Sequence, residues 1–328
     1  MTFTKVVIVG GGPIGIACGI ALQKRGIDYT IIEKGTLVNS LFNYPKNMRF
    51  FSSSKKLEID EIPFVCDQTK PTRDQALEYY RRVAEQYKLN IQLFEKVDRI
   101  ENQSSEATKQ LKFLVHTDKN TYNAHQVILA TGFFDIPKAL NIKGEELPKV
   151  SHYFDDGFYY VNQKLVVVGA SNSAIDAALE CHRKGADVTL VIRGSEVGQR
   201  VKYWVRPDII NRIEEGSIKA YYQSELKEIT SDHVIIQTPN ETLRLENDFV
   251  LAMTGYQPNF QFLNELGVSL IEDEHKAPSY DEQSMQSNIP GIYLAGVIVG
   301  GMKTHKWFIE NSIIHADLIA QHIATAQN

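Results

Sequence analysis

Residues 5–35, "KVVIVGGGPIGIACGIALQKRGIDYTIIEKG", contain the pattern that decides the fold of the first part of the chain. Val6–Val9 is a short, continuous apolar run, which is typical of a parallel strand buried on both faces. A glycine-rich turn follows, and then a helix that we expect to begin at Pro13 and to end just before Gly26. A second apolar run, Tyr29–Ile32, completes a unit of strand, turn, helix and strand.

The turn has glycine at all three positions of the pattern G-x-G-x-x-G, namely Gly10, Gly12 and Gly15. These glycines permit a tight turn, close approach of the backbone to a pyrophosphate, and close packing of the helix on the sheet. Glu33 ends the second strand, where a carboxylate accepts hydrogen bonds from the hydroxyls of an adenosine ribose. The stretch therefore predicts a dinucleotide site.

A second stretch, "KLVVVGASNSAIDAALECHRKGADVTLVIR" at 164–193, repeats this pattern. We expect a strand at Leu165–Val168, a helix at Ser173–Lys184 that stops before Gly185, and a strand at Val188–Ile192. The three fingerprint positions hold glycine, serine and alanine: Gly169, Ser171 and Ala174. Small side chains at the last two positions still allow a nucleotide to approach, and the hydroxyl and amide of Ser171 and Asn172 are able to bind phosphate oxygens.

The second strand of this repeat leads to Arg193 and not to an acid. An arginine at this point suits the 2′-phosphate of NADPH, and NADH has no such phosphate for it to bind. Arg200 and Lys202 add positive charge nearby. A solvated basic loop is the alternative interpretation, but the pattern favours a second dinucleotide site that prefers NADPH.

The composition of the 328 residues suggests a soluble protein of about two domains, with 43% hydrophobic residues and a net charge of −5. An acidic chain gives no indication of nucleic-acid binding. The three cysteines, Cys18, Cys66 and Cys181, match neither metal-ligand spacing nor a disulfide framework, so we expect no metal site and a reducing cytoplasm. We find no signal peptide and no membrane-spanning segment in the sequence.

Alternating apolar and polar segments follow each nucleotide pattern, as expected for antiparallel meanders. They lead to "ATG" at 130–132 and to "MTGYQPN" at 253–259, and "GIYLAGVIVGG" at 291–301 predicts a further buried strand. We therefore predict an α/β fold with two Rossmann-like dinucleotide-binding domains, the second inserted in the first. The expected boundaries are 1–137, 138–256 and 257–328.

This order resembles that of flavoproteins with two dinucleotide-binding domains, over essentially the whole chain. The resemblance implies FAD in the first domain and NAD(P)H in the inserted one. Residues 148–179 are similar to the corresponding part of low-molecular-weight thioredoxin reductases, but the positions of their redox CxxC pair fall on His152 and Asp155. A dithiol relay to thioredoxin is therefore not expected.

A narrower resemblance rests on several dispersed segments: "NYPKNMRFFSSSKKLEI", "PTRDQALEYYR", "LPKVSHYF", "NSAIDAALE" and "FIEN". Together they resemble the bacillithiol disulfide reductase family, which implies cytosolic reduction of a small-molecule disulfide with NADPH and FAD. Two residues depart from the family pattern. Ile14 stands where relatives carry a cysteine, and Val297 stands where many related flavoproteins place an aspartate against the ribityl chain of FAD.

The candidates for residues lining the flavin are His152, Cys18 and Ile14, although Cys18 is more typical of a small buried helix residue. We also expect Lys303, His305 and the start of the last helix to stabilise the reduced flavin. The full set of expected cofactor-binding residues is Gly10, Gly12, Pro13, Ile14, Gly15, Glu33, Lys34, Phe51, Ser52, Val97, Ala130, Thr131, Gly132, Gly169, Ser171, Asn172, Ser173, Arg193, Gly255, Gly296, Val297 and Phe308.

Without an internal dithiol, we expect electrons to pass from NADPH to FAD and then directly to a small acceptor. Three alternatives stay open: a flavin monooxygenase, a ferredoxin or flavodoxin–NADP reductase, and a non-catalytic redox sensor that binds FAD. The monooxygenase signature is not met, because Pro148 occupies its glycine position. A ferredoxin reductase needs a basic docking surface that this composition does not indicate. We also expect a homo-oligomer, a dimer or a tetramer, with no nucleic acid or membrane as partner.

Overall fold

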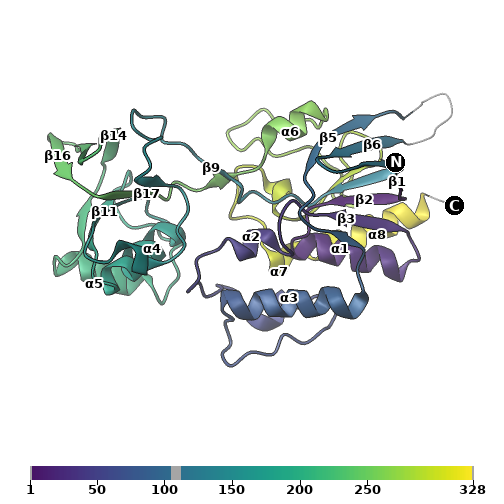
Figure 1. Cartoon of the computed structure of the whole chain (residues 1–328), viewed down its shortest axis with the longest axis horizontal. Helices are drawn as coiled ribbons and strands as arrows, with labels where there is room; N and C mark the ends of the chain where they lie inside the picture. Colours follow the sequence, from purple (N-terminus) through teal and green to yellow (C-terminus); the bar gives the residue numbers. More distant parts are fainter. Residues whose placement is uncertain (1, 105–111, 327–328) are drawn as a thin grey trace. The chain divides into compact units, whose positions relative to one another are not determined.

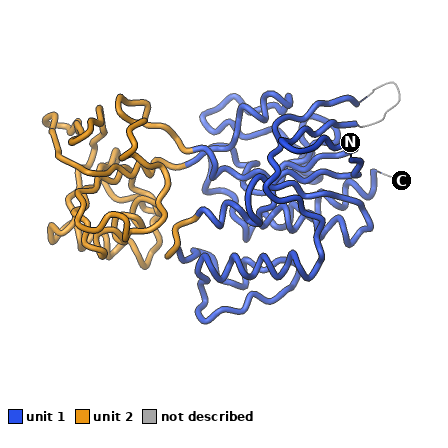
Figure 2. The backbone as a smooth tube through the Cα atoms, viewed as in Figure 1, with its two compact units in different colours: residues 1–43, 48–136, 256–328 blue, residues 44–47, 137–255 orange. Residues whose placement is uncertain are grey.

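A computed structural model of the chain describes residues 2–104 and 112–326. The chain forms two compact units, of which unit 1 comprises residues 1–43, 48–136 and 256–328 and unit 2 comprises residues 44–47 and 137–255 (Figure 2). Strands β9 (Ile136–Pro137) and β18 (Tyr256–Gln257) pair with each other and mark two of the points where the chain passes from one unit to the other. The fold is mixed α/β, as predicted.

The central layer of unit 1 is a five-stranded parallel sheet with the order β19-β8-β2-β3-β4, of which β2 and β3 are labelled in Figure 1. Its strands are β19 (Ile292–Leu294), β8 (Gln126–Leu129), β2 (Val6–Val9), β3 (Tyr29–Ile32) and β4 (Ile91–Gln92). Strands β2 and β3 have the bounds that the sequence predicts. Every residue of both strands is buried, because the sheet is covered on both faces.

The helices of unit 1 are α1 (Pro13–Lys24), α2 (Asn39–Phe42), α3 (Arg73–Tyr87), α6 (Phe260–Glu265), α7 (Ile309–Ser312) and α8 (Ile314–Thr325). Helix α1 is buried from Pro13 to Leu22 because it is made of small and apolar residues. The closing segment was expected as one helix, but it divides at Ile313 into α7 and α8. The Ile313 carbonyl accepts from Ala316 N–H, three residues on, so the chain turns more tightly there than an α-helix.

A second, four-stranded sheet of unit 1 has the order β1-β7-β6-β5. Its strands are β1 (Thr2–Phe3), β7 (Thr121–Ala124), β6 (Phe113–Thr117) and β5 (Val97–Asn102). Strands β5, β6 and β7 are antiparallel, which confirms the predicted meander.

Unit 2 contains another five-stranded parallel sheet, with the order β10-β17-β11-β12-β13. Its strands are β10 (Val150–Ser151), β17 (Phe249–Ala252), β11 (Lys164–Val168), β12 (Asp187–Val191) and β13 (Lys219–Tyr221). The helices are α4 (Asn172–Arg183) and α5 (Arg206–Glu214), and the antiparallel meander is β14 (Glu225–Ile229), β15 (His233–Gln237) and β16 (Thr242–Glu246). The strands and helix of the second nucleotide pattern lie within one residue of their expected bounds.

Candidate functional site

The first glycine-rich turn, between β2 and α1, has the geometry of a phosphate-binding loop. A Cβ on Gly10 would lie 2.5 Å from the Ala130 carbonyl oxygen, and a Cβ on Gly15 would lie 1.9 Å from the Gly10 carbonyl oxygen. A Cβ on Gly12 would meet nothing within 4 Å, so the space at the helix start is open. Gly12 is the N-cap of α1 and has no side chain to cap it. The first N–H groups of the helix are therefore suited to bind the pyrophosphate of a dinucleotide.

Glu33, directly after β3, is buried and held by the turn itself. Its Oε2 accepts from Gly11 N–H at 2.7 Å, and its Oε1 accepts from Gly35 N–H at 3.0 Å. Burial raises the pKa of Glu33, and the two N–H donors only partly oppose that effect. The remaining lone pairs are suited to accept from ribose hydroxyls, so Glu33 and the turn fit the adenosine end of FAD.

Further residues expected at this site have varied surroundings. Lys34 Nζ forms an ion pair with Asp135 Oδ2 at 2.7 Å. Residues 130–132 follow β8, and Gly132 has a positive φ of 68°. Val97 opens β5 and is half-buried. Phe51 is 56% exposed, and Lys70 Nζ lies 4.8 Å from the centre of its ring.

The start of the last helix differs from the expectation of a long helix whose N-terminus stabilises the flavin. Helix α7 has only four residues, and Asn311 caps its start by accepting from Phe308 N–H at 2.7 Å. Lys306 Nζ lies 5.3 Å from the centre of the Trp307 ring. Phe308 is half-exposed.

The second glycine-rich turn, between β11 and α4, is covered at its edge by the loop at 194–202. A Cβ on Gly169 would lie 2.6 Å from the Met253 carbonyl oxygen, so the glycine is needed here too. Gly198 N–H donates to the Ala170 carbonyl at 2.9 Å. The Asn172 side chain, expected at phosphate oxygens, instead accepts from Lys202 N–H at 2.8 Å and donates to the Arg200 carbonyl at 3.2 Å. Asn172 thus fixes the loop to the start of α4.

The charge near the second turn is distributed differently from the sequence expectation. Lys202 is buried, and its Nζ forms an ion pair with Asp176 Oδ2 at 2.6 Å. This pair neutralises the charge that we expected Lys202 to add. Arg193 and Arg200 are exposed, and Arg193 follows β12 at the carboxyl edge of the sheet.

His152, the candidate histidine, is fastened within unit 2. Its Nε2 lies 3.1 Å from Glu145 Oε1, and both side chains are mostly buried. Glu145 also accepts from Leu140 N–H at 2.6 Å and from Asn141 N–H at 2.7 Å. These contacts give His152 a structural role in holding the loop at 140–145.

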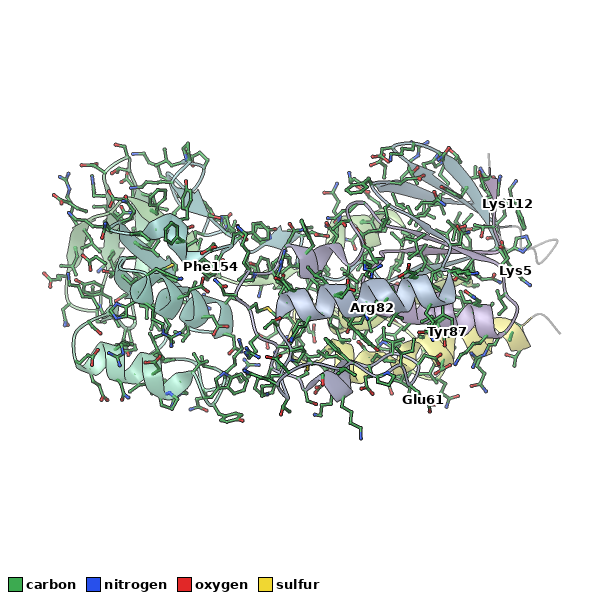
Figure 3. All side chains as sticks on the ribbon, turned by 60° about the horizontal axis from the view of Figure 1, so that its bottom comes forward. Lys5, Glu61, Arg82, Tyr87, Lys112 and Phe154 are labelled. Atoms are coloured by element: carbon green, nitrogen blue, oxygen red, sulfur yellow. The ribbon has the colours of Figure 1, made fainter. Side chains whose placement is uncertain are left out.

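The aromatic residues near His152 divide into two groups. Phe154, labelled in Figure 3, is buried in unit 2, and its ring centre lies 6.4 Å from that of Tyr160. Tyr160 in turn packs edge-on against Phe249. Phe158 and Tyr159 are each 70% exposed. Core packing in unit 2 therefore explains Phe154 and Tyr160.

Comparison with known proteins places the chain in a family. The model of the pyridine nucleotide-disulphide oxidoreductase family matches residues 7–296. The bacilliredoxin reductase Bdr of Bacillus subtilis is 40% identical over 325 residues, which cover 99% of this chain and 98% of the relative. The chain belongs to the bacilliredoxin reductase family. It is an FAD-dependent disulfide oxidoreductase that uses NADPH.

Solved structures of the family agree closely with the chain. Bacillithiol disulfide reductase Bdr from Bacillus cereus has a TM-score of 0.95 at 41% identity, and the match covers 99% of this chain and 100% of that one. The enzyme of that name from Staphylococcus aureus has a TM-score of 0.95 at 37% identity, over the whole of both chains. Thioredoxin reductase of T. acidophilum, at 20% identity, covers 100% of this chain and 99% of its own with a TM-score of 0.77, and shows the shared fold alone.

Ile14, at the position of the expected family cysteine, lies in a closely packed contact at the start of α1. Ile14 is 8% exposed, and a Cβ on Gly296 would lie 3.3 Å from its Cγ1 atom. Gly296 N–H donates to His315 Nδ1 at 3.1 Å. Burial lowers the pKa of His315 to about 4, so the ring is neutral at pH 7 and Nδ1 is able to accept. His315 was not predicted from the sequence, because its hydrogen-bond partner Gly296 lies 19 residues away.

The three cysteines provide no redox pair. Cys18 and Cys181 are buried, and burial raises the pKa of each thiol to about 12. A thiol with such a pKa stays protonated at neutral pH and is a poor nucleophile. Cys66 is partly exposed, and its Sγ donates to the Gln68 carbonyl at 2.8 Å.

Among the residues in 2–104 and 112–326, we also find no group of three or more His, Cys, Asp or Glu placed to hold a metal. In the same part of the chain, none of the helices has the length and apolar character needed to cross a membrane.

Proposed function

We propose that this protein reduces bacillithiol disulfide to two thiols, with NADPH as the electron donor and FAD as the carrier. The names of the solved relatives from Bacillus cereus and Staphylococcus aureus support this acceptor. In this proposal, unit 1 and unit 2 are Rossmann-like domains that bind FAD and NADPH. The open helix start beyond Gly12 and the buried Glu33 support FAD in unit 1. We propose the cytoplasm as the location and a dimer or tetramer as the working form.

The observation that carries the mechanism is Ile14 at the position of the family cysteine, together with the deep burial of Cys18. Bound FAD supplies the capacity to take a hydride from NADPH and to give up two electrons. These two electrons cleave the S–S bond of the acceptor, and each sulfur takes up a proton. NADPH and one proton are consumed, and NADP⁺ and two thiols are formed. No cysteine of the protein forms a mixed disulfide in this route.

The chain's own residues then act by binding and by shaping the flavin site. Glu33 orients the adenosine, the first N–H groups of α1 bind the pyrophosphate, and Ile14 packs against Gly296 in the first turn of the helix. Arg193 selects NADPH through the 2′-phosphate, since a guanidinium forms two parallel hydrogen bonds to phosphate oxygens.

An anaerobic stopped-flow screen tests this function. The FAD-loaded protein is reduced with one equivalent of NADPH and then mixed with bacillithiol disulfide, glutathione disulfide, ferredoxin or oxygen. We expect bacillithiol disulfide to reoxidise the flavin fastest and to yield two thiols per NADPH. Faster reoxidation by ferredoxin or oxygen, with little thiol formed, would contradict the proposal and favour a ferredoxin reductase or a monooxygenase.

A further inference from the structure

Lys138 is held firmly at the carboxyl edge of the parallel sheet in unit 2. Its N–H donates to the Gly255 carbonyl at 2.9 Å, and its own carbonyl accepts from the Thr254 hydroxyl at 2.5 Å. A Cβ on Gly255 would lie 4.0 Å from Lys138 Cδ, so the lysine side chain runs past this glycine. Lys138 is thereby fixed to the turn that follows β17.

Arg193 stands at the same edge of the same sheet. Strands β12 and β17 pair with opposite sides of β11, and Val168 is level with both Val191 and Ala252. Arg193 and Lys138 therefore flank the glycine-rich turn that begins at Gly169, where open α/β sheets bind their ligands. Burial and the neighbouring charge of Arg193 both lower the pKa of Lys138, so the two cations lie close enough to repel each other.

In the described part of the chain, no acidic side chain neutralises either of these two cations. Within residues 2–104 and 112–326, no carboxylate lies within ion-pair distance of Lys138 or Arg193. By contrast, Lys202 Nζ, in the same region, forms an ion pair with Asp176 Oδ2 at 2.6 Å. Two neighbouring positive groups without an acid destabilise the free protein and favour a bound anion.

We propose that Lys138 and Arg193 together bind the 2′-phosphate of NADP(H), which makes Lys138 a second residue that selects this nucleotide. This inference rests on the proposed role of Arg193. A phosphate with a charge of about −1.5 to −2 matches two cations, of which the guanidinium fixes the orientation and the ammonium acts as a point charge. A ribose 2′-hydroxyl in NADH cannot offset their repulsion.

Equilibrium binding of NADP⁺ and NAD⁺ to the oxidised, FAD-loaded protein tests the assignment by calorimetry. We expect Lys138→Met to weaken NADP⁺ binding by roughly tenfold, the effect of one charge-assisted hydrogen bond, and to leave NAD⁺ binding unchanged. Lys138→Arg should keep most of the affinity for NADP⁺. Lys219→Met is the matched control, because Lys219 is an exposed lysine at the amino end of β13, level with Thr189 of β12, and it should change neither affinity.

An equal loss for NADP⁺ and NAD⁺ would place Lys138 at the pyrophosphate and overturn the proposal, as would an unchanged affinity for both. In Lys138→Met/Arg193→Ala, the two nucleotides should bind with nearly equal affinity, and a retained NADP⁺ preference would contradict the assignment. None of these measurements involves a disulfide acceptor. A failure here is therefore distinct from a failure of the proposed acceptor.

Discussion

The two glycine-rich turns share a backbone plan and differ in the charge that follows the second strand. In unit 1 the acid Glu33 is buried and accepts from Gly11 and Gly35, so it is part of the folded turn. In unit 2 Arg193 is exposed, and burial together with the charge of Arg193 lowers the pKa of a second cation, Lys138. In our proposal, the same backbone plan serves two nucleotides, and the residue after the strand decides whether ribose hydroxyls or a phosphate is recognised.

The third fingerprint position provides another contrast. In unit 1 a Cβ on Gly15 would lie 1.9 Å from the Gly10 carbonyl oxygen, so the helix approaches the turn as closely as a glycine allows. In unit 2 the equivalent residue is Ala174, whose Cβ lies 3.1 Å from the position of a Cβ on Gly169. Helix α4 thus has room for a methyl group where α1 has none.

We expect the largest effect from Gly15→Ala, because its methyl group would overlap a backbone carbonyl that cannot move away. The variant should lose about 3 kcal/mol of unfolding free energy and should not retain FAD. Urea unfolding and the ratio of FAD to protein after gel filtration measure both. The counterpart Ala174→Gly should cost only about 1 kcal/mol and keep FAD. Normal FAD content in Gly15→Ala would contradict the claim that α1, unlike α4, has no room for a methyl group at this position.

Glu33→Gln should weaken FAD binding on the order of a hundredfold, since it removes charge-assisted hydrogen bonds to the ribose. Burial raises the pKa of Glu33 above its unfolded value, so ionisation of Glu33 costs the folded apoprotein stability as pH rises through that pKa. FAD needs the ionised acceptor. Its binding in the parent should therefore strengthen as pH rises through the raised pKa and weaken on acidification.

The fluorescence of FAD released from the protein, recorded at a series of pH values, measures this dependence. The Glu33→Gln variant should lose the part of the pH dependence that comes from this carboxyl. The same pH dependence in parent and variant would exclude Glu33 as the titrating group.

Arg193→Ala should cost about 1.5 to 3 kcal/mol of NADPH binding, or roughly ten- to hundredfold, and should barely affect NADH. The half-saturating concentration of each nucleotide for flavin reduction is the measurement. Equal use of NADPH and NADH by the unmodified protein would show that the charge after β12 does not select the nucleotide.

Ile14→Cys should have the smallest effect of the series, a severalfold rise in disulfide turnover. The substitution places a thiol at the start of α1, where the helix dipole lowers a cysteine pKa and favours the thiolate. Steady-state NADPH oxidation with the disulfide acceptor measures it, and Ile14→Ala is the control for lost volume. A rise of equal size in both variants would show that the effect comes from the smaller side chain at position 14 and not from the thiol.

Local sequence predicted the nucleotide units well, because each is a continuous segment with its own signals. The apolar runs at Val6–Val9 and Tyr29–Ile32 gave strands with the expected bounds. Side-chain partners distant in sequence were not predictable: Lys202 is neutralised by Asp176, 26 residues away, and Gly296 donates to His315, 19 residues away. The charge state and the hydrogen-bond partners of these residues could therefore be assigned only from the folded structure, whereas the strands and helices could be predicted from the sequence.

The central claim is that electrons reach the disulfide without a thiol of the protein. The direct test is disulfide turnover by the triple variant Cys18→Ser/Cys66→Ser/Cys181→Ser, compared with the parent at equal FAD content. We expect turnover within about twofold of the parent, with a loss of stability of about 1–3 kcal/mol for each buried hydroxyl left unsatisfied. A folded, FAD-loaded triple variant whose flavin is reduced normally by NADPH but which cannot reduce the disulfide would contradict the account.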